Sequence, residues 1–332
     1  MRPCGATGRV NMFMLLLAAA DALSFLHIPE TGEAAPDACG LAAPPVLRSN
    51  QSVGLVRIQK TGSTALVALW KREFLRTRDR VWNEWSHDHH HDWHAVSTGS
   101  GFYNAAHREQ PADLIVVNLR DPVERVLSEY YFCVTRRNCA QQIQWDYRLF
   151  RTWANKSAST DTGLRGLRER LEEHLAGKRR LSLREWLRWP GNPAHDRMSH
   201  YVSGLRYGEF WTGEALADAL RNLCDARAVV LLSVDLPEES RALARYELGW
   251  QTTAEEWARH CERHWRRTEA PDHLPPAPAR TAVSDEIRAE IRARNPNDVL
   301  LYDLARKIVL SRAAVVGPSS RRPSVSPPSG GK

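Results

Sequence analysis

Two short polar segments of this chain combine cations, hydroxyl groups and a small residue in a way that suits anion binding. The first runs from Gln59 through Lys60, Thr61, Gly62 and Ser63 to Thr64, and the second runs from Arg120 to Ser128. Each follows an apolar, β-branched run and precedes apolar residues at helical spacing, which predicts a strand, a turn and a helix. A ligand with two separate phosphate groups would suit such a pair of turns.

The first segment has the features of an anion cradle. A turn that enters a helix exposes unpaired backbone N–H groups and the positive end of the helix dipole. Gly62 lets an anion approach the backbone closely, Lys60 adds a full charge, and the hydroxyl groups add donors. The order of residues is not the G-x-x-x-x-G-K-[ST] phosphate loop. An ordinary turn with a surface lysine is the alternative interpretation.

The second segment places a cation where open α/β sheets bind ligands. Arg120 stands at the carboxyl end of a predicted strand, which is the usual ligand edge of such a sheet. A guanidinium group binds phosphate in a bidentate manner. Ser128 follows about two turns into the next helix. The alternative is a local ion pair between Arg120 and Asp121, with Ser128 in solvent.

A histidine-rich tract, residues 87–94, lies between the two segments. Histidine titrates near neutrality and can take a proton from a hydroxyl group. Metal binding and a solvated polar loop are the alternatives for such a tract.

The elements that must position these residues alternate between strand and helix. An Asp235–Glu238 pair resembles a helix cap after the third strand. This alternation predicts an α/β fold around a central parallel sheet flanked by helices. The predicted strands are Val53–Ile58, Leu114–Leu119 and Val229–Val234, and the predicted helices are Thr64–Arg76, one that starts at Pro122, Ser284–Arg294 and Asn297–Leu310.

Composition and the two ends of the chain set the wider frame. The chain has 332 residues, 42% of them apolar, and a formal net charge of +7. That charge favours anionic partners without naming one. Residues 1–26 read as a signal peptide or signal anchor, because basic residues precede a short apolar run and an A-x-A-like site. We expect a stem or linker at 27–52, one globular domain at 53–312 and a disordered tail at 313–332.

The six cysteines fit the secretory pathway that such a leader implies. Cys133 with Cys139, and Cys224 with Cys261, are possible pairs, and free buried thiols are the alternative. Two sequons, at Asn50 and Asn155, permit glycosylation.

The two segments resemble the 5′-phosphosulfate loop and the 3′-phosphate motif of sulfotransferases that use 3′-phosphoadenosine 5′-phosphosulfate (PAPS). The likeness covers about Val53 to Leu310 and is closest to the Golgi heparan sulfate 6-O- and 2-O-sulfotransferases. The segments 192–201 and 297–303 are also similar to that group. The resemblance implies a P-loop-NTPase-like sulfotransferase fold.

The resemblance also implies a role for each site residue. Gln59–Thr64 would hold the 5′-phosphate, Lys60 would stabilise the leaving phosphate, and Arg120 and Ser128 would bind the 3′-phosphate. His90 matches the family's His-x-Asp-Trp base, with His89 and His91 as competitors. The product would be adenosine 3′,5′-bisphosphate, and no metal is required.

Two features depart from the family pattern. Ser63 stands where the family usually has a second glycine. Residues 25–33 resemble the first loop again, but with Glu30 in place of the lysine, and carboxylates there would repel phosphate. We interpret the second copy as chance or decay.

The expected acceptor is an anionic, glycosaminoglycan-like polysaccharide. Residues 165–188 are rich in arginine and lysine, with Trp186 and Trp189 placed to stack on sugars, although a solvated helix is an equal alternative. We expect a location in the secretory pathway, in the Golgi lumen, either as a type II membrane protein held by the N-terminal segment or as a secreted protein, and no nucleic-acid partner. A non-catalytic polysaccharide-binding protein and a nucleotide-dependent phosphotransferase are the competing functions.

Overall fold

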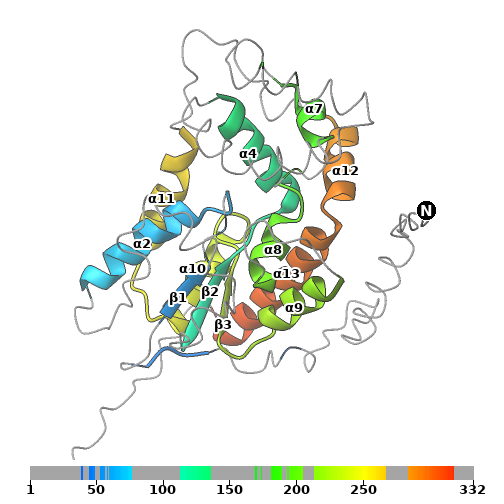
Figure 1. Ribbon diagram of the computed structural model, residues 1–332. Helices are drawn as coiled ribbons and strands as arrows, with labels where there is room; N and C mark the ends of the chain where they lie inside the picture. Colours follow the sequence, from blue (N-terminus) through cyan, green and yellow to red (C-terminus); the bar gives the residue numbers. More distant parts are fainter. Residues whose placement is uncertain are drawn as a thin grey trace, which may run out of the picture.

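The computed structural model describes residues 39, 45–48, 53–56, 58, 60–76, 113–135, 169, 173, 181–188, 192, 194–204, 213–266 and 283–317. Three strands and nine helices lie in these ranges (Figure 1). The strands are β1 (Val53–Val56), β2 (Leu114–Asn118) and β3 (Ala228–Leu231). The helices are α2 (Ser63–Arg76), α4 (Pro122–Thr135), α7 (Leu183–Leu187), α8 (Arg197–Ser203), α9 (Gly213–Leu223), α10 (Pro237–Glu247), α11 (Ala254–Arg266), α12 (Asp285–Arg294) and α13 (Pro296–Val316).

The strands form one parallel sheet in the order β1-β2-β3. Val56 pairs with Val117, and Val117 pairs with Val230, so the carboxyl ends of all three strands meet at one edge. Every residue of the central strand β2 is buried, as expected for a parallel strand covered on both faces. The predicted α/β class with a central parallel sheet is confirmed.

Helices lie on both sides of the sheet (Figure 1). α2 packs against α11 on one side, while α8, α9 and α13 pack together on the other. α10 contacts β3, α11 and α13. The predicted apolar face of α4, which includes Val123, Leu127 and Tyr130, is buried as expected.

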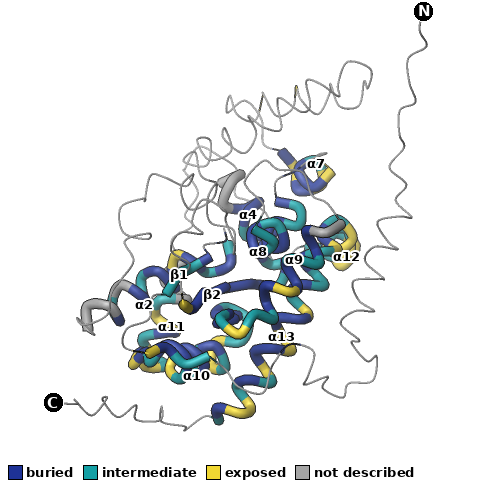
Figure 2. The backbone as a smooth tube through the Cα atoms, turned by 60° about the horizontal axis from the view of Figure 1, so that its bottom comes forward, coloured by how far each residue is buried: buried dark blue, intermediate teal, exposed yellow. Residues whose placement is uncertain are grey.

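The apolar interior has two parts. The larger cluster surrounds the sheet and includes residues of α2, α9, α10 and α13. The smaller cluster joins α4 to α7 and α12 through residues such as Leu127, Trp186 and Ile291. β2 and β3 are buried throughout, whereas β1 is mostly half-buried, and Figure 2 shows exposed residues on α10 and α12. The apolar face of α4 is therefore covered by α7 and α12 and not by the sheet.

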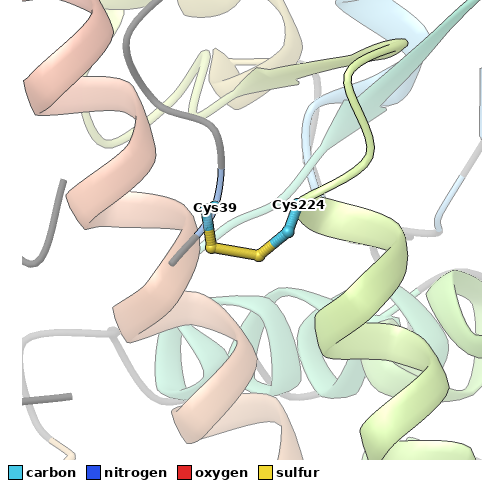
Figure 3. The surroundings of a disulfide bond; sticks show 2 residues. All are labelled: Cys39 and Cys224. Carbon is cyan, nitrogen blue, oxygen red and sulfur yellow. A yellow bond between two sulfur atoms is a disulfide. The ribbon is translucent and has the colours of Figure 1, made fainter. Parts of the chain in front are cut away.

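A disulfide bond joins Cys39 to Cys224 at the end of α9 (Figure 3). The possible pairing of Cys224 with Cys261 is therefore excluded, because Cys224 is bonded to Cys39. Cys139 and the side chain of Cys133 lie outside the described residues. Leu47 is buried in the larger cluster, and its N–H donates to the carbonyl of Glu247 at 2.7 Å. The folded domain thus includes residues that the sequence places in the linker.

The last helix of the domain also extends beyond the expected boundary. α13 continues to Val316, past the expected boundary at residue 312. None of the described helices is long and apolar enough to cross a membrane. Residues 1–26 and 318–332, for which a leader and a disordered tail were predicted, lie outside the described ranges.

Candidate functional site

The turn between β1 and α2 has an unusual backbone. Lys60 has a φ of 65° and Gly62 has a φ of 88°. A Cβ atom on Gly62 would lie 2.8 Å from Cγ2 of Val234 and 3.1 Å from Oγ of Ser233. Only glycine fits there, because the turn after β3 packs directly against it. A lysine with positive φ is uncommon and marks a conformation that its surroundings must hold in place.

The hydroxyl groups of this loop have different roles. Thr61 and Ser63 are buried, and both donate to the carbonyl of Ile58, at 3.0 and 2.8 Å. Thr64 is exposed and Lys60 is half-buried. The groups of this loop that can meet a ligand are therefore the Lys60 side chain, the Thr64 hydroxyl and the backbone N–H groups of the first turn. That turn carries no acidic residue.

Serine at position 63 suits this loop. Its hydroxyl donates to Ile58, and the residue begins α2 without a positive φ. Serine at this position therefore needs no left-handed backbone conformation.

Two side chains from the end of β2 hold this turn. Asn118 is fully buried; its Nδ2 donates to the carbonyl of Thr61 at 2.6 Å, and its Oδ1 accepts from the N–H of Ser233 at 3.1 Å. Nη1 of Arg120 donates to the carbonyl of Lys60 at 3.2 Å. The turns that follow all three strands are thus bonded together at one edge of the sheet, which is where open α/β sheets bind ligands.

Sequence reasoning gave Asn118 no role. It is the last residue of the buried run Leu114–Asn118, and a buried polar residue requires partners. The sequence therefore indicated that Asn118 needs hydrogen-bond partners, but it did not indicate which residues these are.

Asp121 immediately precedes α4, and Ser128 lies further along the helix. Oδ1 of Asp121 accepts from the N–H of Glu124 at 3.0 Å, which is an N-cap. Ser128 is half-buried, about 9 Å along the helix axis from Pro122 at 1.5 Å per residue. The contacts described for this region do not bring Ser128 to Arg120 or to the first loop.

Asp235 does not cap the helix that follows it. α10 begins at Pro237 after Leu236, without a side-chain cap, so the predicted Asp235–Glu238 cap is wrong. Oδ2 of Asp235 instead accepts from the N–H of Asp121 at 2.6 Å. Burial raises the pKa of Asp235, while the charge of Arg120 and the hydroxyl of Tyr302 act to lower it.

A buried charged cluster fixes α4 from its other side. Arg125 lies 2.7 Å from Glu129 and 3.7 Å from Asp298, and Arg197 lies 3.0 Å from Glu129. Asp298 also accepts from the N–H groups of Met198 and Ser199. The chain segments around Arg197 and Asp298, which are far apart in the sequence, therefore meet at this cluster.

The same cluster shifts the pKa values of its neighbours. Burial and the charge of Asp298 raise the pKa of Asp196 to about 7. Burial, with the charges of Arg294 and Arg125, lowers the pKa of His195 to about 4. His195 is therefore neutral at pH 7.

Several predicted site residues cannot be placed. Gln59 and His90, with the whole 87–94 tract, lie outside the described residues. Of the basic stretch 165–188, the segment 181–188 is described, and there Arg184 and Arg188 are exposed. Trp186 is buried, with its ring 5.7 Å from that of Tyr130, so it is not available to stack on a sugar.

Over the described ranges, no group of three or more His, Cys, Asp or Glu side chains is placed to hold a metal ion. Comparisons with protein-family models, curated proteins and solved structures find no match to the chain.

Proposed function

We propose that this chain is a PAPS-dependent O-sulfotransferase that acts on a hydroxyl group of an anionic, glycosaminoglycan-like polysaccharide. The observation that carries the proposal is the contact between the two polar segments. Asn118 and Arg120 both donate to carbonyl groups of the first loop, at 2.6 and 3.2 Å. Two cations that follow separate strands, Lys60 after β1 and Arg120 after β2, thereby belong to one edge of the sheet, which suits a nucleotide with a phosphate at each end.

The proposed reaction is an in-line transfer. His90 takes the proton of the acceptor hydroxyl, and the hydroxyl oxygen attacks the sulfur. The bond between sulfur and the bridging phosphate oxygen breaks, and the electron pair stays on the 5′-phosphate. Lys60 stabilises the charge that develops there, together with the backbone N–H groups at the start of α2. The products are the sulfated sugar and adenosine 3′,5′-bisphosphate.

Transfer of labelled sulfate from PAPS to a panel of desulfated glycosaminoglycans tests this proposal. We expect incorporation by the wild-type protein that survives EDTA, because the cations are side chains. Lys60→Ala and Arg120→Ala should lower the rate of transfer by at least about a hundredfold, since each removes a positive side chain that stabilises the transition state or binds the donor. Arg245→Ala, which removes an exposed cation of α10, is the matched control and should retain full activity.

Binding and transfer separate the competing functions. His90→Ala should still bind adenosine 3′,5′-bisphosphate but transfer no sulfate. If the wild-type protein binds heparin without incorporating label, the chain is a non-catalytic binding protein. Phosphate transfer that EDTA abolishes would instead establish a phosphotransferase. The acceptor sugar and the position sulfated would follow from disaccharide analysis of the labelled product.

A further inference from the structure

Asp235 lies at the candidate site, although none of the motifs that suggested the site includes it. It follows β3 by four residues and sits in a tight turn, where the N–H groups of Asp235 and Leu236 both donate to the carbonyl of Leu232. The hydroxyl of Ser240 accepts from the N–H of Leu232 at 2.9 Å and fixes the turn from α10. The backbone of the turn that carries Asp235 is therefore fixed by these hydrogen bonds.

From this turn the carboxylate reaches across to the second motif. It accepts the N–H of Asp121, the residue between Arg120 and the first turn of α4. A carboxylate acceptor for that N–H is a charge-assisted hydrogen bond, which is stronger than a neutral one. Asp235 thus holds the backbone immediately after Arg120.

Tyr302 supports Asp235 from α13. Its hydroxyl donates to the Asp235 carboxylate, and burial together with the charge of Asp235 raises the pKa of Tyr302. The charges that face Asp235 are those of Arg120 and Asp121, and Arg292 of α12 lies 3.9 Å from the Asp121 carboxylate. The turn is thus held between β3, α4 and α13.

We propose that Asp235 is the positioning residue of the 3′-phosphate end of the site, and that Tyr302 holds it in place. This inference rests on the proposed function, because it assumes that Arg120 binds the 3′-phosphate. The hydrogen bond to the N–H of Asp121 fixes the backbone next to Arg120. The negative charge of Asp235 lowers the positive electrostatic potential where the 3′-phosphate would bind. The hydrogen bond therefore raises the affinity for the 3′-phosphate, whereas the negative charge lowers it.

Two substitutions separate these effects. Asp235→Ala removes both the acceptor and the charge, whereas Asp235→Asn keeps an acceptor for the Asp121 N–H and removes only the charge. The readout is the ratio of affinities for adenosine 3′,5′-bisphosphate and adenosine 5′-monophosphate, which differ only in the 3′-phosphate. A general structural defect would weaken both ligands equally, while a loss of position at Arg120 weakens the bisphosphate alone.

We expect Asp235→Ala to weaken the bisphosphate about tenfold and the monophosphate by less than about twofold. Asp235→Asn should bind the bisphosphate at least as tightly as the wild-type protein. Tyr302→Phe should weaken it about threefold, because the anchor is lost but the Asp121 contact remains. Asp303→Asn, an exposed carboxylate next to Tyr302 on α13, is the control for charge alone and should leave the ratio within about twofold of wild type.

The outcomes distinguish this inference from the function on which it rests. If the wild-type protein binds the two nucleotides equally, the 3′-phosphate site is absent and both proposals fail. Two other outcomes would overturn only the positioning role, provided that the wild-type protein prefers the bisphosphate. In the first, Asp235→Ala has the same ratio of affinities as the wild-type protein. In the second, Asp235→Asn loses as much affinity for the bisphosphate as Asp235→Ala does. Thermal unfolding of each variant tests whether it is folded. If Asp235→Ala does not fold, Tyr302→Phe tests the positioning role of Asp235 instead.

Discussion

Lys60 carries both the charge and the unusual backbone of the first loop. A residue with a side chain at a φ of 65° costs about 1 kcal/mol relative to glycine. The contacts of Asn118 and Arg120 to the carbonyls of Thr61 and Lys60 hold this conformation. Strain kept at a loop that faces a candidate ligand suggests that the position of the lysine matters more than local stability.

Replacing Lys60 tests this strain. Lys60→Gly should be more stable than Lys60→Ala by about 1 kcal/mol, because alanine keeps the Cβ that disfavours positive φ. Both variants should lose sulfate transfer, since both lack the ammonium group. Urea unfolding measures the difference. Lys307, exposed within α13, supplies the control, where alanine should be more stable than glycine by about 1 kcal/mol. The same sign at both positions would contradict the strain at Lys60.

Glu247 is a buried carboxyl group whose charge is poorly compensated. Neither carboxylate oxygen has a hydrogen-bond partner among the described residues, and the Arg312 guanidinium lies 3.8 Å away. Burial raises the pKa of Glu247 from 4.5 to about 8. The folded protein therefore keeps a proton that the unfolded chain releases, and stability falls as the pH rises from about 4.5 through about 8.

Glu247→Gln should remove this dependence. From pH 6 to pH 9 the unfolding temperature of the wild-type protein should fall relative to that of the variant, because unfolding of the wild-type protein releases the Glu247 proton and glutamine has none to release. At pH 9 the wild-type protein should unfold at the lower temperature, because its folded state then holds a buried carboxylate charge. Glu238→Gln, in an exposed ion pair on the same helix, should follow the wild-type curve. Parallel curves for Glu247→Gln and the wild-type protein would show that Glu247 is ionised throughout.

At the scale of the elements, the site depends on how the turns after three strands are joined. Asn118 connects these turns, because its amide donates to a carbonyl of the turn after β1 and accepts from an N–H of the turn after β3. Asn118→Ala leaves the Thr61 carbonyl and the Ser233 N–H without that partner. We expect a loss of about 3 kcal/mol in unfolding free energy and of most binding of adenosine 3′,5′-bisphosphate.

Asn222→Ala is the matched control for the Asn118 variant. Asn222 is also buried and donates to the carbonyl of Val202 at 2.7 Å, away from the sheet edge. Its loss should lower stability by a comparable amount and leave nucleotide binding unchanged. Equal loss of binding in both variants would mean that Asn118 acts through overall stability only.

The sequence predicted these elements because their patterns are local. The apolar runs of the strands, the proline at the start of α4 and the buried face of Val123, Leu127 and Tyr130 can all be read within a few residues. The partners of Asn118 and Asp235 could not be predicted, because they depend on which strand ends meet in the sheet. Asp235 illustrates the difference, since local spacing favoured a cap on α10 while the fold placed its carboxylate against α4.

At the scale of the whole molecule, a covalent bond and a buried segment attach the chain before β1 to the domain. The Cys39–Cys224 bond spans 185 residues, which include β1, β2 and both polar segments. Closing so long a loop restricts the unfolded chain, for which the chain-entropy model gives about 5 kcal/mol as an upper value. Leu47 adds a second anchor, because it is buried and bonded to Glu247.

The double variant Cys39→Ser/Cys224→Ser should therefore lose about 2–5 kcal/mol of unfolding free energy. Urea unfolding under non-reducing conditions measures the loss. Dithiothreitol should lower the stability of the wild-type protein to that of the double variant and leave the variant unchanged, because the bond is then already absent. A further fall of the variant in dithiothreitol would reveal another stabilising disulfide. No difference between the variant and the wild-type protein would mean that burial of Leu47 and its neighbours holds the segment without the covalent bond.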